Sequence, residues 1–334
     1  MTEIKIFADL ADRFYALYFD REYEQALDIV VRESPRFPDY SIVAAWWQMR
    51  MMALTGDLAG ALHALEKVLA QEQWYHEDAL HNVPDLAALQ EISKFEGFVA
   101  RCRERRLEAV AKASPSLTVF EPQNHPRPWR LLIPLGAGPA DPNFANHWTP
   151  AVDEGWLVAV PQSSQAGWFS GLYVWDDIER TKLEIQQHYN DLSEQYGVDE
   201  NRFVIAGMSK HCQAALQVAL SDTSPKPCGF IAVEAWLSDM RIWPQFDIGS
   251  WPQTIQANAN PALRCYFIAG KENKYYEAAE KVIELLRAQG IACKLEGTSN
   301  KRHGFPPEFE ASLKRALDFA LKPQTGAQRE RKAS

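Results

Sequence analysis

Two residues far apart in the chain, Ser209 and His303, are the pair best suited to nucleophilic chemistry. Ser209 follows the apolar run 204–208, and the residues after it switch at once to helical spacing. A serine on a sharp turn between a strand and a helix has its hydroxyl exposed for attack on a substrate. Serine is a weak nucleophile until a base takes its proton, and a histidine can do this at neutral pH. The pair therefore predicts covalent catalysis, with a helix N-cap as the simpler explanation for Ser209.

The elements that must position this pair alternate between strand and helix. Short apolar runs rich in β-branched or aromatic residues, typical of strands buried on both faces, occur at 130–134, 156–160, 203–206, 229–233 and 265–269. Helical spacing separates or follows them at about 176–196, 210–221, 275–289 and 308–321. This alternation predicts the α/β class, a mostly parallel sheet with helices on both faces. Functional residues of such sheets lie on loops at the C-terminal ends of the strands, and Ser209 falls there.

The first 112 residues have helical spacing only, which predicts a separate all-α domain over 1–112. Similar segments begin at Tyr23 and Leu58, and residues 56–61 resemble the small-residue helix crossing of a tetratricopeptide (TPR) repeat. The domain is therefore predicted to be TPR-like, with an irregular helical bundle as the alternative. A proline-rich linker is expected at 113–128, an α/β domain at 129–323 and a polar tail at 324–334.

Composition excludes several classes of function. A net charge of -9 argues against nucleic-acid binding, which needs a basic face. The five cysteines form no C-x-x-C pair, and the histidines lack metal-ligand spacing, so we expect neither a disulfide scaffold nor a metal site. The glycines of 136–138 do not continue into a phosphate-binding loop, so no nucleotide cofactor is expected. Without a basic-then-apolar leader or a membrane-length apolar run, the expected location is cytoplasmic.

From about residue 117 to 321 the chain resembles the α/β-hydrolase superfamily, nearest to the carboxylesterase/phospholipase-like serine hydrolases. The resemblance is carried by the Ser209 turn and by the segments 161–165, 173–177, 270–276 and 303–306. The segments 161–165 and 173–177 are similar to those of a subgroup that has an N-terminal helical-repeat region. The order of nucleophile, acid and histidine along the chain is also that of the superfamily.

The resemblance implies a role for each matching residue. Ser209 would attack an acyl carbon while His303 takes its proton and returns it to the leaving group. The backbone N–H groups of Lys210 and Ala137 would face the oxyanion. The residues expected to contact substrate are Gly136, Gly138, His211 and Trp236.

The acid that orients the histidine is the open point. The family acid aligns with Asn273, whose amide cannot stabilise an imidazolium as a carboxylate does. The adjacent Glu272 is the preferred candidate. Glu234 and Asp239, which follow the preceding strand, are the alternatives, and a missing acid would leave only feeble catalysis.

Two functions follow from these residues. The first is a serine hydrolase that cleaves a small-molecule carboxylic ester through an acyl-enzyme on Ser209. Its N-terminal helices would shape the entrance, join subunits of a homo-oligomer or bind a protein partner. The second is a catalytically weak or inactive hydrolase-fold protein that serves as a binding or scaffold module, because Leu135, His211 and Asn273 all depart from the family pattern.

Overall fold

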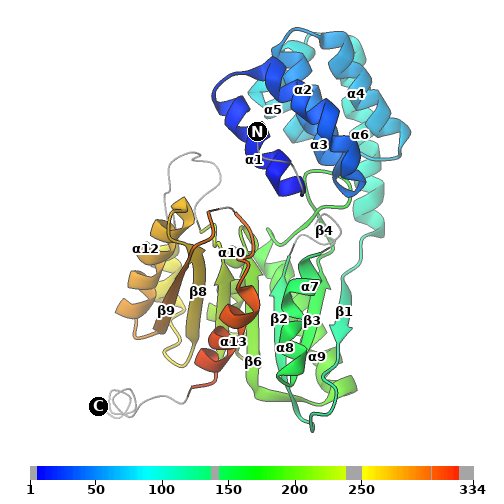
Figure 1. Ribbon diagram of the computed structural model, residues 1–334. Helices are drawn as coiled ribbons and strands as arrows, with labels where there is room; N and C mark the ends of the chain where they lie inside the picture. Colours follow the sequence, from blue (N-terminus) through cyan, green and yellow to red (C-terminus); the bar gives the residue numbers. More distant parts are fainter. Residues whose placement is uncertain (1–5, 137–142, 238–249, 302, 323–334) are drawn as a thin grey trace. The chain divides into compact units, whose positions relative to one another are not determined.

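A seven-stranded sheet forms the centre of the larger part of the chain in this computed structural model, which describes residues 6–136, 143–237, 250–301 and 303–322 (Figure 1). The strand order is β1-β3-β2-β6-β7-β8-β9, and every pairing is parallel except the one between β1 and β3. The strands are β1 (Ser116–Phe120), β2 (Trp129–Leu135), β3 (Trp156–Gln162), β6 (Val198–Met208), β7 (Gly229–Val233), β8 (Arg264–Gly270) and β9 (Ala292–Thr298). The predicted α/β class with a mostly parallel sheet is confirmed.

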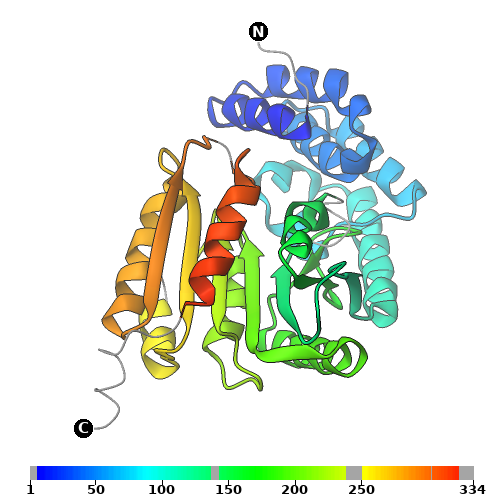
Figure 2. The ribbon, with the colours of Figure 1, turned by 60° about the horizontal axis from the view of Figure 1, so that its bottom comes forward.

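Helices cover both faces of this sheet because its side chains are apolar on both. Leu131 and Ile133 of β2 pack into one core with helices α9 to α12, whereas Leu132 packs into another with α7, α8 and α13. Figure 2 shows α12 and α13 on opposite faces. The helices are α7 (Phe144–Trp148), α8 (Pro150–Asp153), α9 (Ile178–Tyr196), α10 (His211–Leu220), α11 (Trp251–Ala257), α12 (Lys274–Ala288) and α13 (Phe309–Ala320).

The chain divides into two compact units, and their boundaries differ from the predicted ones. Unit 1 comprises residues 1–114 and 164–173, and unit 2 comprises 115–163 and 174–334. Part of the predicted linker, 113–128, is the edge strand β1, paired with β3. The prolines on either side of this strand and its half-exposed side chains hide it in the sequence, since edge strands are seldom fully apolar.

Unit 1 is helical, as predicted. Its helices are α1 (Phe7–Phe19), α2 (Tyr23–Glu33), α3 (Ser41–Leu54), α4 (Leu58–Ala70), α5 (Glu77–Asn82) and α6 (Ser93–Lys112), with three 3-10 turns at Ser34–Arg36, Pro38–Tyr40 and Pro84–Leu89. The segment 164–173 joins this unit through main-chain bonds, from Ser170 to Trp74 (3.0 Å) and from His76 to Trp168 (2.7 Å). It includes strand β4 (Gln165–Ala166), which pairs with β5 (Tyr173–Val174). The TPR-like character of the helices stays a prediction.

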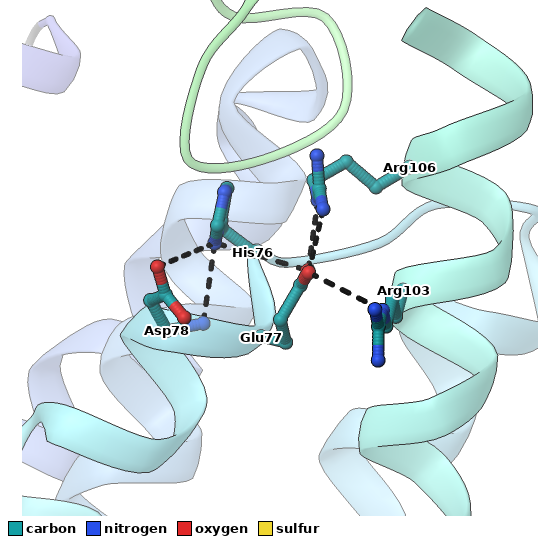
Figure 3. Close-up of polar contacts among 5 residues, drawn as sticks. All are labelled: His76, Glu77, Asp78, Arg103 and Arg106. Atoms are coloured by element: carbon teal, nitrogen blue, oxygen red, sulfur yellow. Dashed lines mark hydrogen bonds and ion pairs between the residues drawn. The ribbon is translucent and has the colours of Figure 1, made fainter.

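A charged cluster connects α5 to α6 within unit 1 (Figure 3). Two guanidinium nitrogens of Arg106 donate to the Glu77 carboxylate at 2.8 and 2.5 Å, and Arg103 lies 3.9 Å from it. The Nδ1 atom of His76 is 3.8 Å from carboxylate oxygens of both Glu77 and Asp78. The Arg106 hydrogen bonds lower the pKa of Glu77 to about 2, so its carboxylate is held charged by the fold.

We expect Glu77→Gln to lower the free energy of unfolding by about 1–3 kcal/mol at neutral pH, because it removes charge-assisted hydrogen bonds from a largely buried pair. A carboxyl whose pKa is lower in the folded state stabilises the protein at pH values above its pKa in the unfolded state. This contribution falls as pH drops from about 5 towards 2. Urea unfolding at neutral pH and near pH 3 should therefore show a gap that narrows with acid. Asp78→Asn, at a side chain that is 77% exposed, is the control with little expected effect. If the difference in unfolding free energy between wild type and Glu77→Gln did not change with pH, the lowered pKa of Glu77 would be contradicted.

Candidate active site

Ser209 lies at the turn between β6 and α10, in a conformation that few residues other than glycine adopt. Its φ is 56°, in the left-handed region, which costs a residue with a side chain about 1–2 kcal/mol. Two main-chain bonds hold it there, from the Ser209 N–H to the Val233 carbonyl (2.9 Å) and from the Trp236 N–H to the Ser209 carbonyl (3.1 Å). The turn is thus tied to the end of β7, and the half-buried serine projects from its tip.

Close packing of helix and strand at this turn depends on Gly207. A Cβ there would lie 2.9 Å from main-chain atoms of His211 and Cys212, so any larger residue would push α10 away from β6. The superfamily pattern has a small residue at position 211 as well. His211 is accommodated as the half-buried first residue of α10, because the closest approach falls on Gly207. Burial, and then the charge of Lys210, lower the pKa of His211 to about 4, so its ring is neutral at physiological pH.

The structure brings the predicted nucleophile and base together. His303 comes from the loop after β9, and its Nε2 lies 2.7 Å from the Ser209 Oγ. In the neutral tautomer protonated at Nδ1, the serine hydroxyl donates to Nε2. His303 is exposed, so the pair is open to a ligand. This geometry allows the imidazole to remove the serine proton as the oxygen attacks.

The loop that carries His303 is anchored on both sides of the histidine. The Asn300 side chain donates to the Gly304 carbonyl at 3.0 Å. The Tyr275 ring packs against the imidazole, with ring centroids 4.4 Å apart. Phe305 enters an aromatic cluster with Phe144, His147, Trp148 and Phe309. The sequence did not identify Tyr275 or Asn300 as site residues, because their contacts with the histidine loop depend on how the segments after β8 and β9 pack.

Glu234, directly after β7, is a buried carboxylate at this edge of the sheet. Its side chain is 1% exposed, and its oxygens accept from the Gly270 N–H (3.0 Å) and the Asn273 Nδ2 (3.1 Å). Burial raises the pKa of Glu234 to about 7, although the Gly270 bond opposes the rise. Burial and then the Glu234 charge raise the pKa of Tyr275 to about 12. Tyr275, which contacts His303, is therefore also a neighbour of this carboxylate.

The preferred acid of the sequence, Glu272, occupies a different position. Its side chain is 70% exposed and forms an ion pair with Lys301 at 2.9 Å. Asn273 is the N-cap of α12, so its side chain turns inward while that of its neighbour turns to solvent. Glu272 therefore faces solvent, whereas Glu234, one of the alternatives, is buried, and the identity of the acid stays a prediction. Asp239, the other alternative, lies outside the described residues.

The predicted oxyanion side is described only in part. Lys210 precedes α10, and its Nζ forms an ion pair with Asp176 at 2.6 Å. Gly136 follows β2, and a Cβ there would lie 2.6 Å from the Phe144 ring. The Gly136 carbonyl accepts a hydrogen bond from the buried Trp175 indole at 3.0 Å. The remaining candidates in this loop, Ala137 and Gly138, lie outside the described residues.

Aromatic side chains border the pair on the β7 side. Trp236 is half-buried, and its ring centroid is 6.1 Å from that of Tyr275. An apolar wall of this kind suits an acyl or aromatic group. Among the described residues, no group of three or more His, Cys, Asp or Glu side chains could hold a metal ion. No helix in the same part of the chain has the length and apolar character to cross a bilayer.

A serine on a left-handed turn at the end of a central parallel strand, in a sheet of this order, defines the α/β-hydrolase fold. The resemblance predicted from the sequence is confirmed at the level of the fold.

Comparisons with known proteins give structural matches only, since neither a family model nor a curated protein matches the chain. The chain is similar to an uncharacterised protein from Bacillus cereus ATCC 10987, with 21% identity, 95% of this chain and 99% of that one covered, and a TM-score of 0.48. It is also similar to the Bacillus cereus carboxylesterase (16% identity, 64% and 99% covered, TM-score 0.45). A third match is a thermophilic esterase from Thermogutta terrifontis (16% identity, 65% and 94% covered, TM-score 0.47).

Proposed function

We propose that the chain is a serine hydrolase that cleaves a small-molecule carboxylic ester through an acyl-enzyme on Ser209. The observation that carries the proposal is the 2.7 Å separation between the Ser209 Oγ and the His303 Nε2. A serine held at φ 56° on a tight turn supports it, since strained backbone is concentrated at functional sites. A serine that only capped a helix would need neither the left-handed φ nor the short distance to His303. The Ser209 side chain has the His303 imidazole as its hydrogen-bond partner.

The reaction would proceed in two steps. The Ser209 oxygen attacks the acyl carbon as His303 takes its proton, and the imidazolium then protonates the departing alcohol. Water then attacks the acyl carbon as the same imidazole takes its proton, and the imidazolium returns that proton to the Ser209 oxygen as the carboxylic acid is released. The Lys210 N–H, first after the nucleophile, would donate to the oxyanion, a contribution of about 10²–10³ in rate.

Glu234 completes the proposed triad as the group that stabilises the imidazolium. It is the buried carboxylate beside Tyr275, whereas Glu272 is engaged with Lys301 at the surface. A carboxyl whose pKa is near 7 is only partly charged alone, and a neighbouring imidazolium favours its ionised form. With Glu234 in this role, the departure at Asn273 no longer argues for a catalytically inactive protein.

A fluorophosphonate probe tests this proposal because it reacts with activated serines. We expect the folded wild type to be labelled at Ser209, identified by peptide mass spectrometry, and Ser209→Ala to remain unlabelled. Ser250→Ala, at an exposed serine of unit 2, is the matched control and should label normally. Absence of labelling, or equal turnover of a short p-nitrophenyl ester by wild type and Ser209→Ala, would favour a scaffold role instead.

A further inference from the structure

The Asn273 side chain makes two bonds of different kinds. Its Oδ1 accepts from the Tyr275 N–H at 3.4 Å and so caps α12, while its Nδ2 donates to a Glu234 oxygen at 3.1 Å. These partners fix the orientation of the amide, because the reverse orientation would set oxygen against carboxylate. A helix cap requires only the first bond, and serine or aspartate supplies it as well as asparagine does.

The bond from the Asn273 Nδ2 restrains the flexible side chain of Glu234. Glu234 has three rotatable bonds, and its two oxygens are held by Asn273 and by the Gly270 N–H. Both donors come from the turn between β8 and α12. This turn packs tightly on the segment leading to His303, since a Cβ on Gly270 would lie 1.8 Å from the Asn300 carbonyl oxygen.

We propose that Asn273 is a positioning residue that favours the ionised form of the Glu234 carboxylate and fixes its direction for its role with His303. The proposal rests on the hydrolytic function proposed above. Asn273 thus occupies the position where the resembling family carries its acid, and serves an acid that has moved to the preceding strand. A donor at this position favours the charged form of Glu234, whereas an acceptor or a shorter hydroxyl does not.

In the described part of the chain, the titratable groups near Glu234 include the Tyr275 phenol on α12, the Cys212 thiol on α10 and the His303 imidazole beside Tyr275. Burial raises the pKa of both Tyr275 and Cys212, so these two stay uncharged. Among the described residues, the Asn273 amide donates to the Glu234 carboxylate and can favour its charged form without itself titrating.

The test uses Asn273→Asp and Asn273→Ser, which keep a good helix cap but remove the amide donor. We expect Asn273→Ser to lower kcat for a p-nitrophenyl ester about 10- to 100-fold with little change in KM. In both variants the acidic limb of the kcat/KM profile should move to higher pH, further in Asn273→Asp because a second carboxylate opposes ionisation of the first. Thermal unfolding should show both variants folded.

Asp57→Ala in unit 1 is the matched control, since it removes another N-cap that accepts a main-chain bond, here from Gly60 at 2.9 Å. It should cost stability and leave the pH profile unchanged. If Asn273→Asp and Asn273→Ser keep the wild-type profile and kcat, Asn273 is only a cap and the inference is overturned while the hydrolase proposal stands. A wild type that neither labels nor turns over ester would overturn both.

Discussion

Ser209→Ala and His303→Ala are each expected to lower kcat for ester hydrolysis by about 10⁴–10⁶, and the double variant is expected to lose no more than either one. The reason is that the hydroxyl and the imidazole, 2.7 Å apart, would act as a unit in the proposed mechanism, so that removing either one would abolish the contribution of both. Effects of independent residues would instead multiply.

Steady-state kinetics of the two single variants and the double variant with one p-nitrophenyl ester measures this non-additivity. His63→Ala, at a side chain 63% exposed in unit 1, is the control that should retain wild-type rates. A double variant slower than both single variants by a further large factor would show that the two residues act separately. Wild-type activity in His303→Ala would exclude it as the base.

Glu234→Gln is expected to lower kcat by about 10³–10⁴, because an amide stabilises an imidazolium far less than a carboxylate does. Glu272→Gln, the matched change at the surface residue paired with Lys301, should stay within about twofold of wild type. Comparing kcat of the two variants directly distinguishes the buried acid from the one that the sequence favoured. A large loss in Glu272→Gln with little loss in Glu234→Gln would reverse the assignment.

Although Glu234→Gln is expected to lower kcat, it should increase the unfolding free energy relative to wild type as the pH rises. A carboxyl whose folded pKa is raised, here to about 7, favours the folded state below its unfolded pKa and loses that contribution as pH rises through the folded value. Between pH 5 and pH 8 the unfolding free energy of Glu234→Gln should therefore gain about 2 kcal/mol relative to wild type. Urea unfolding at both values measures this. A difference that does not change with pH would mean that Glu234 is not a buried ionisable acid.

Features that are unfavourable for folding are concentrated at the proposed site. Ser209 and Glu234 both have positive φ, 56° and 45°, and Glu234 is almost wholly excluded from water. Each feature is unfavourable for folding, and the surrounding sheet and helices must offset it. Both residues lie directly after neighbouring parallel strands, where such strain can be supported by well-packed elements.

The sequence alone determined the features that depend on short stretches of chain. The switch from an apolar run to helical spacing around Ser209 indicates a strand, a turn and a helix. The patterns of a buried strand and of a helix can be told apart within a few residues. The alternation after residue 129 gave the α/β class for the same reason. His303 was found from the resemblance, through the segment 303–306 and its place after the nucleophile and the acid in chain order.

Only the tertiary structure decided which of the candidate carboxylates is buried and which faces solvent. Glu272 and Asn273 are neighbours in sequence, yet the cap at α12 turns one outward to Lys301 and the other inward to Glu234. The bond between Asn273 and Glu234 joins residues 39 positions apart, and no local pattern records it. The edge strand β1 and the membership of 164–173 in unit 1 were likewise invisible, because both depend on main-chain pairing with distant segments. Local spacing reveals elements, but side-chain direction at their ends is set by what packs against them.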